Sequence, residues 1–192
     1  MGADPSTQTM RQLAERAATM KRVWSGEKLT ESVLPVGPPP PHRKGGPVLH
    51  VGTTGPKTIR SAVDWADGIA GGVTLDLDAV EQNELFDVAR SAWAEAGRPA
   101  PHLATSFWFA IGDGDGPRVQ VTRHLHHYMN WIPSEFVDAI APTTGWAGTE
   151  AELGEVLRRF ADIGTDEVQL IPTSTDPPDQ LRRAADVVAA FA

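Results

Sequence analysis

The sequence predicts an α/β fold built from parallel strands and intervening helices. Four short apolar segments alternate with longer segments whose apolar residues recur every three or four positions. Such alternation favours a parallel sheet with helices packed on it. Right-handed crossovers leave two arrangements, an open doubly wound sheet or part of a (β/α)₈ barrel. No predicted strand is followed by G-x-G-x-x-G, which disfavours the dinucleotide-binding open sheet.

The elements can be placed from their apolar spacing and from the residues that end them. A helix opens the chain, with apolar residues at helical spacing from Met10 to Trp24, a possible cap in Asp4-Pro5-Ser6 and Gly26 as its end. The prolines and glycines of 35–47 exclude regular helix or central strand there. We expect either an ordered surface loop or a flexible linker. Residues 1–192 are predicted to form one domain that contains this loop.

The remaining elements form four successive β–α units, closed by glycine and proline. Strands are expected at 48–51, 69–70, 103–111 and 167–172, and helices at 57–65, 78–96, 119–131, 134–140, 149–163 and 179–191. The run Asp113-Gly114-Asp115-Gly116-Pro117 is predicted to be a turn, because it lacks the later ligands of a calcium loop.

Composition excludes several functional classes. The 192 residues carry a formal net charge of −8 and no cysteine. Nucleic acids and anionic membranes need clustered Lys and Arg, so we expect neither as a partner. Without cysteine, disulfides, thiolate metal sites and cysteine nucleophiles are excluded. The sequence shows no signal peptide and no run of about 18 apolar residues, and we expect a cytoplasmic protein.

The strongest candidate site is the turn between the first predicted strand and the next helix. Gly52, Thr53, Thr54, Gly55 and Lys57 lie where the carboxyl end of a strand meets a helix N-terminus. Glycines allow a close approach of the backbone to an anion, and the first N–H groups of a helix point at it. The threonines add hydroxyl donors, and Lys57 adds a positive charge. The alternative is an ordinary β–α turn with Thr as helix cap.

Other polar and aromatic residues carry weaker hypotheses. His124 and His127 share a helix face, as two metal ligands can. However, no carboxylate completes the H-E-x-x-H pattern of a zinc site. A surface helix rich in histidine is therefore favoured over a metal site. His50 is expected in the core or, alternatively, beside a cofactor, where it would position substrate or donate a proton. Asp67 is expected in a polar network rather than in catalysis. Core packing is expected for four tryptophans, Trp65, Trp93, Trp108 and Trp131. For Trp108 the alternative is that its side chain lines a pocket.

Several segments together resemble the luciferase-like monooxygenases, which include bacterial luciferase and the flavin- and coenzyme F420-dependent oxidoreductases. The centre of the resemblance is the run from Gly46 to Gly52, followed by Gly55-Pro56-Lys57 and Ala66-Asp67-Gly68. Further matching pieces follow in the family's order over almost the whole chain: Trp24-Ser25-Gly26-Glu27, Ala96-Gly97-Arg98-Pro99, Ile163 to Val168 and Asp179-Gln180-Leu181.

The resemblance implies a cofactor enzyme whose barrel is incomplete in this chain. Family members are (β/α)₈ barrels, which typically need about 250 residues, and the four strands would be the fifth to eighth. The family uses the loop Gly52, Thr53, Thr54, Gly55 and Lys57 for the phosphate of FMN or F420, and the sequence does not choose between these cofactors. The resemblance names no catalytic residue of this chain, and flavin chemistry needs no metal.

The implied activity is that of an FMN- or F420-dependent oxidoreductase or monooxygenase acting on a small organic substrate. Two alternatives stay open: a truncated, non-catalytic half-barrel remnant, and an assembly module in which half barrels pair. The strands predicted at 48–51 and 167–172 would be open edges, which folded proteins normally cover. We therefore expect a homodimer or a partner chain that covers them.

Overall fold

The structure is a computed structural model of the chain. It describes residues 9–31, 46–53, 55–71, 79–173 and 177–190, with the backbone alone for 79–82. Contacts group the chain into two compact units, Met1–Ile69 with Asp87–His102 and Ala70–Phe86 with Leu103–Ala192. The prediction of one domain over residues 1–192 stays a prediction.

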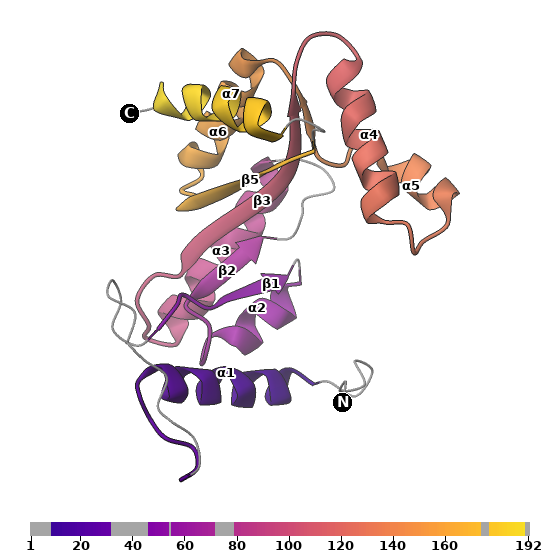
Figure 1. The fold of residues 1–192 in the computed structure, drawn as a ribbon. Helices are drawn as coiled ribbons and strands as arrows, with labels where there is room; N and C mark the ends of the chain where they lie inside the picture. Colours follow the sequence, from indigo (N-terminus) through magenta and orange to yellow (C-terminus); the bar gives the residue numbers. More distant parts are fainter. Residues whose placement is uncertain (1–8, 32–45, 54, 72–78, 174–176, 191–192) are drawn as a thin grey trace. The chain divides into compact units, whose positions relative to one another are not determined.

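Helices and strands alternate along the chain as predicted (Figure 1). In order, the described elements are α1 (Met10–Trp24), β1 (His50–Thr53), α2 (Pro56–Ala62), β2 (Gly68–Gly71), α3 (Ala79–Glu95), β3 (His102–Ile111), α4 (Gly116–Tyr128), α5 (Ser134–Ile140), β4 (Trp146–Gly148), α6 (Glu150–Asp162), β5 (Glu167–Pro172) and α7 (Pro177–Ala189). None of the helices in this described part is long and apolar enough to cross a membrane.

Helix α1 begins at a capping box. Thr9 Oγ1 accepts the N–H of Gln12 at 3.2 Å, and the Gln12 side chain accepts the N–H of Thr9 at 2.9 Å. Two N–H groups near the start of the helix are satisfied in this way. The cap predicted at Asp4-Pro5-Ser6 lies outside the described residues. Gly26, with a φ of 93°, ends α1 as predicted.

Asp67 joins the start of β2 to β1 and α1 in the first unit. Its N–H donates to the carbonyl of Leu49 at 2.7 Å, and its carboxylate accepts the N–H of Leu49 at 2.9 Å. The same carboxylate forms an ion pair with Lys21 of α1 at 3.1 Å. Next to it, Gly68 packs so closely on the backbone of His102 that an added Cβ atom would overlap it. The polar network expected around Asp67 is confirmed.

Strand β3 is the central strand of the second unit. Both β4 and β5 pair with it in parallel, with Phe109 opposite Trp146 of β4 and Ser106 opposite Gln169 of β5. These pairings confirm the prediction of parallel strands. Because β3 has a neighbour on each side, its apolar residues are buried, whereas β5 has no fully buried residue.

The start of β5 repeats the arrangement seen at β2. Asp166 donates its N–H to the carbonyl of Leu103 at 2.8 Å, and its carboxylate accepts the N–H of Leu103 at 2.8 Å. The same arrangement thus occurs at two places in the chain. At Asp67 and at Asp166, an aspartate immediately before one strand forms hydrogen bonds to the backbone at the start of the neighbouring strand.

The side chains of β3 divide between two cores. Phe107, Phe109 and Ile111 pack with α6 and α7, whereas Trp108 and Ala110 pack with α4 and α5. This division follows from the two-residue period of a strand, which sends successive side chains to opposite faces. Figure 1 shows the two pairs of helices on opposite sides of β3.

The sequence predicts four strands, and the structure describes five. The additional strand is β4, which follows Gly145 in a segment predicted as a break between helices. It has three residues, too few to show the alternation by which a strand is recognised. The first strand, predicted at 48–51, is shifted to His50–Thr53. The turn predicted at 113–117 is shorter, because α4 already begins at Gly116.

Candidate functional site

The predicted anion site is the loop from Gly52 to Lys57, between β1 and α2. Gly52 lies in β1 and is exposed, Thr53 ends the strand half-buried, and Gly55 is the N-cap residue that precedes α2. Thr53 Oγ1 accepts the N–H of Gly55 at 2.9 Å. Thr54, which the sequence places in the same site, lies outside the described residues. The structure therefore brings the four other predicted residues together at the carboxyl end of β1.

No described residue requires glycine at Gly52 or Gly55. Neither has a positive φ, so neither uses the conformational freedom of glycine. A Cβ atom added at Gly52 would meet nothing within 4 Å, and one at Gly55 would meet only Thr53 Oγ1 at 3.7 Å and Thr58 Oγ1 at 3.6 Å, which are ordinary contacts. The loop thus leaves its backbone uncovered where a side chain would fit, as a phosphate cradle requires.

The first turn of α2 offers donors and a positive charge to an anion. Gly55 provides no side-chain cap, and Pro56 follows it without an N–H. The first bond inside the helix runs from the N–H of Ile59 to the carbonyl of Gly55, at 3.1 Å. The N–H groups of Lys57 and Thr58 precede that bond and lack a partner inside the helix by construction. Lys57 is exposed and adds a mobile ammonium group.

Sequence reasoning missed Thr58 as part of this loop. Its hydroxyl oxygen lies near both Gly55 and the predicted site, and the residue is half-buried. A hydroxyl residue in the first turn after a Gly-Pro pair is the signal that would have found it, because such a side chain reaches the same anion as the N–H groups beside it.

His50 contacts His102 rather than pointing into an apolar core. The His50 Nε2 and His102 Nδ1 atoms lie 2.9 Å apart, and the ring centroids are separated by 4.9 Å. Both residues are half-buried in the first unit. One imidazole must donate and the other accept, so the contact needs at least one of them neutral. The expectation of a core histidine is thus only partly correct.

The three histidines of α4 have separate environments. His126 Nε2 lies 3.0 Å from a carboxylate oxygen of Asp138 in α5, whereas His124 packs against Trp108, with ring centroids 5.5 Å apart. Burial lowers the pKa of His124, and the nearby His127 lowers the pKa further, which favours the neutral form of this imidazole. Among the described residues, no three His, Cys, Asp or Glu side chains are grouped as a metal site would need.

Three of the four tryptophans are core residues, as predicted. Trp65, Trp93 and Trp108 are buried. Trp131 is 69% exposed and contacts Tyr128 edge-on, with centroids 5.7 Å apart. The prediction of a core position was wrong for Trp131, which lies in the turn between α4 and α5, where no described element covers it.

Polar side chains of α7 hold the carboxyl end of β3. Gln180 accepts the N–H of Ile111 at 2.6 Å and donates to its carbonyl at 3.1 Å, and Arg183 donates to the same carbonyl at 2.9 Å. Arg183 also pairs with Glu150 of α6 at 2.6 Å. Sequence reasoning missed Gln180 and Arg183, although polar residues on the core-facing side of an amphipathic helix were a visible signal. Their bonds are satisfied within the chain, which indicates a structural role.

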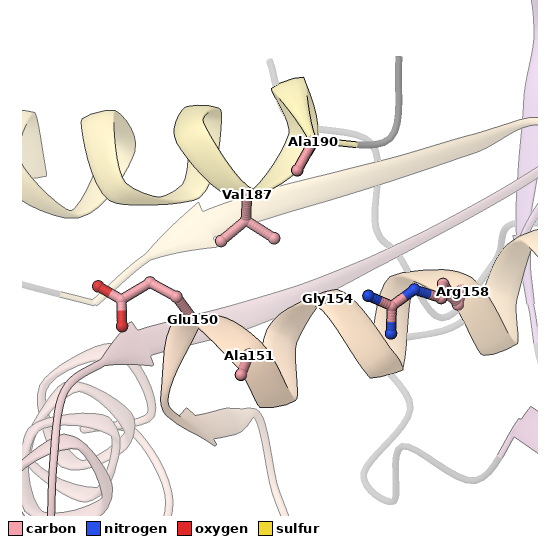
Figure 2. Close-up of a pocket in the computed structure, with 6 residues that line it drawn as sticks. All are labelled: Glu150, Ala151, Gly154, Arg158, Val187 and Ala190. Atoms are coloured by element: carbon pink, nitrogen blue, oxygen red, sulfur yellow. The ribbon is translucent and has the colours of Figure 1, made fainter.

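A groove of about 270 Å³ lies between α6 and α7. Figure 2 shows Val187 of α7 turned toward α6 and Ala190 just after the end of α7, with Glu150 and Arg158 of α6 at separate points along the groove. Gly154 forms part of its wall, and a Cβ atom there would meet Arg158 and Val187 at ordinary distances of 3.6 and 3.8 Å. Gly154 therefore contributes no side chain to this part of the groove.

Parallel strands, intervening helices and a glycine-containing loop at the carboxyl end of a strand define an α/β protein with a candidate anion site. The chain belongs to the luciferase-like monooxygenase family, whose model matches residues 1–159. The matched range includes the loop from Gly52 to Lys57, and the resemblance found in the sequence is thereby confirmed. No curated protein matches the chain significantly.

Solved structures of similar fold share little sequence with this chain. An F420-dependent secondary alcohol dehydrogenase in complex with an F420-acetone adduct has a TM-score of 0.70 at 13% sequence identity. The match covers 95% of this chain and 62% of the dehydrogenase chain. A coenzyme F420-dependent tetrahydromethanopterin reductase from Methanopyrus kandleri has a TM-score of 0.62 at 12% identity, covering 95% and 64%. The chain therefore spans about three fifths of the length of these two structures.

A third similar structure is shorter. Flavoprotein 390 has a TM-score of 0.52 at 13% identity, and the match covers 93% of this chain and 87% of that one. At sequence identities this low, the structural similarity establishes the α/β fold and nothing more specific.

Proposed function

We propose that this chain is the cofactor-binding part of an FMN- or F420-dependent oxidoreductase that acts on a small organic substrate. In this proposal its β–α units belong to a (β/α)₈ barrel that the chain fills only in part. The loop from Gly52 to Lys57 binds the phosphate of the cofactor.

The observation that carries the proposal is the form of this loop within the matched part of the family. Gly52 and Gly55 have ordinary backbone angles and room for a side chain, so the fold alone does not account for glycine at either position. A phosphate group does account for them, because an anion must approach the backbone N–H groups closely. Lys57 in the first turn of α2 supplies the opposite charge.

The similar structures support the proposal at the level of the cofactor class. Two of them are named as F420-dependent enzymes, and a third is named as a flavoprotein. The flavoprotein also supports the size of the proposed cofactor-binding part, because this chain covers most of the length of the flavoprotein. A fold of about this size therefore occurs in a protein whose name records a flavin.

The residues described fit a phosphate ester rather than a reacting group. The N–H groups of Lys57 and Thr58 and the hydroxyl groups of Thr53 and Thr58 can donate to phosphate oxygens, and the Lys57 ammonium balances part of their charge. A bound flavin or deazaflavin supplies the redox chemistry. The task of this loop is to hold one end of the cofactor and so fix the position of its ring.

The test is cofactor binding with and without the phosphate. Purified chain is titrated with FMN, with riboflavin, which lacks the phosphate, and with F420, and binding is followed by cofactor fluorescence. We expect FMN to bind at least about tenfold more tightly than riboflavin if FMN is the cofactor, which corresponds to about 1.4 kcal/mol. Binding of F420 alone would identify the deazaflavin instead.

Matched variants locate the phosphate site. Lys57→Ala and Arg60→Ala each remove one positive charge from α2, the first from its first turn and the second from its last. Only Lys57→Ala is expected to reduce the preference for FMN over riboflavin. If the chain takes up neither FMN nor F420, the proposal fails, and a non-catalytic remnant becomes the better interpretation.

A further inference from the structure

A groove of about 440 Å³ lies along one side of α4, in the second unit. The residues that line it follow one another at steps of one, three and four positions and so share one side of the helix: Arg118, Val119, Thr122, Arg123 and His126. The volume is within the range of small-molecule sites, about 300–1,000 Å³. The loop proposed to bind the cofactor phosphate belongs to the first unit, so this groove is a separate feature.

The guanidinium group of Arg118 is held by backbone carbonyls at the end of α5. Helix α5 packs beside α4 (Figure 1). The Nη1 atom of Arg118 donates to the carbonyl of Ala141 at 3.2 Å and to that of Thr144 at 2.8 Å. The Nη2 atom donates to the carbonyl of Gly145 at 3.2 Å. A guanidinium that is already fixed loses little conformational freedom when it binds a ligand.

Two N–H groups of Arg118 are left for a further acceptor. A guanidinium has five N–H groups, and the three bonds to carbonyls use three of them. The other two, one on Nε and one on Nη2, have no acceptor among the described residues. N–H groups on neighbouring nitrogens of a guanidinium can bind both oxygens of one carboxylate. Arg118 thus presents the kind of donor pair that a carboxylate requires.

The positive charges of this groove are not balanced by carboxylates in the part of the chain that the structure describes. Burial lowers the pKa of Arg118, because it removes water from the charged form, and carbonyls are the partners that replace the water. Arg123 is exposed and also forms no ion pair with a described residue. His126 differs from both, since its Nε2 atom lies 3.0 Å from a carboxylate oxygen of Asp138. The two arginines therefore leave a positive charge in the groove that an anion would balance.

The same groove also offers an apolar contact and a hydroxyl group. Val119 is 64% exposed and is the apolar residue of the lining. Thr122 is half-buried, and its hydroxyl can donate to or accept from a ligand. A ligand that uses all these groups has an anionic end and an apolar body.

We propose that this groove on α4 binds a small organic carboxylate. The carboxylate lies between the guanidinium groups of Arg118 and Arg123, and the apolar body of the ligand covers Val119. The proposal is independent of the cofactor, so its failure would leave the proposed function untouched.

The surroundings of the groove favour a ligand with a single negative charge. Asp113 and Asp115 are exposed just before α4, and Asp138 is exposed beside His126. The whole chain has a formal net charge of −8. These carboxylates repel nucleic acids and other polyanions, and they also disfavour a doubly charged phosphate ester. A small carboxylate gains the local attraction with less of this repulsion.

The experiment is an NMR titration of the full chain, labelled with ¹⁵N, at low ionic strength. Benzoate is the probe, and benzamide is its uncharged analogue of nearly the same shape. We expect benzoate to shift the backbone amide signals of residues 118–126 in a saturable way, with a dissociation constant on the order of 1 mM. Benzamide is expected to bind at least about tenfold more weakly, because it lacks the charge.

A matched pair of variants at Val119 tests the role of charge. Val119→Asp places a carboxylate in the groove and should weaken benzoate binding at least about tenfold. Val119→Asn has nearly the same shape without the charge, so its binding should stay within about threefold of the wild type. Because Val119 is largely exposed, both variants should fold, which circular dichroism would verify.

Variants of the arginines test which cations hold the carboxylate. Arg118→Lys keeps the charge but not the pair of N–H groups, and Arg123→Gln removes a charge. Each should weaken benzoate binding, whereas Arg159→Ala on α6 and Lys57→Ala on α2 should leave it unchanged. If Arg118→Lys fails to fold, the Val119 pair decides the question.

Three results would overturn the proposal. One is the absence of saturable shifts at residues 118–126 up to about 10 mM benzoate. Another is benzamide binding as tightly as benzoate. The third is a Val119→Asp variant that binds benzoate as the wild type does.

Discussion

Helices α2 and α6 both begin directly after a strand, yet their N-termini are built in opposite ways. At α6, Thr149 Oγ1 accepts the N–H of Glu152 at 3.4 Å, and the Glu152 carboxylate accepts the N–H of Thr149 at 2.7 Å. At α2, Gly55 offers no side-chain cap, and the first turn contains Lys57 and no acidic residue.

The two N-termini differ in what the chain itself supplies. The positive end of the α6 dipole is balanced by Glu150 and Glu152 and by the capping bonds, so the chain itself supplies what the helix lacks. The same end of α2 is balanced by nothing among the described residues of its first turn. In the proposed function an anion completes α2, whereas the acidic first turn of α6 would repel it.

The largest effect is expected when α2 is given the kind of end that α6 has. Gly55→Asp places a carboxylate at the start of α2, where it can accept the free N–H groups and occupy the position of a phosphate. We predict that binding of the phosphate-bearing cofactor falls by more than about tenfold, while the melting temperature is unchanged or higher. Fluorescence titration and a thermal melt measure the two quantities.

Gly55→Ala is the control for that substitution. Its Cβ atom meets only ordinary contacts within the chain, at 3.6 and 3.7 Å, so folding should be unaffected. If Gly55→Asp binds the cofactor as tightly as the wild type does, the loop is not the phosphate site.

The second effect is on stability, when α6 is deprived of its cap. Thr149→Ala removes the acceptor for the N–H of Glu152, and we expect the free energy of unfolding to fall by about 1 kcal/mol. Denaturant unfolding measures this loss. Thr149→Ser, which keeps the hydroxyl, should recover most of it, and cofactor binding should not change in either variant.

A smaller gain is expected in the middle of α6. Gly154→Ala removes the entropic cost of glycine inside a helix, and the added methyl group meets Arg158 and Val187 at ordinary distances. We expect the free energy of unfolding to rise by about 0.5–1 kcal/mol. A fall would show that α6 and α7 pack more closely at the groove than these distances indicate.

The smallest expected effect is on the stability of the fold at acidic pH. Hydrogen bonds from the backbone N–H and then the side chain of Thr149 lower the pKa of Glu152 below its usual value. The native state therefore binds this proton less readily than the unfolded state does, and the contribution to stability is present above about pH 4.5 and lost as pH falls below it. Glu152→Gln should flatten the decline of the melting temperature between about pH 5 and pH 3. An unchanged slope would mean that Glu152 is not coupled to folding.

The sequence predicts those features that depend on local pattern. The helix expected at 149–163, the strand ending at Ile111 and the order of β–α units follow from spacing and from glycine, and the structure confirms them. The loop from Gly52 to Lys57 was likewise visible, because glycines between a strand and a helix are informative without tertiary contacts.

The features that the sequence does not reveal depend on distant contacts. The strand β4 is defined by pairing with Phe109 to Ile111, far from it in the chain. His50 is paired with His102, and Gln180 is used by the backbone of Ile111. The apolar spacing of α7 predicts a buried helix but does not show that the Leu181 side would be left exposed, since that depends on which neighbours are present.

Gly68 has a consequence for how the first unit assembles. Strand β2 has only four residues, and a strand so short has few side chains with which to define its alignment. Because Gly68 is the residue that lies against the backbone of His102, a slip by one position would press Ile69 or Asp67 into a space that accepts no Cβ atom. The absence of a side chain at one residue thus acts as a steric check on misaligned folding, and it does so without contributing any attractive contact.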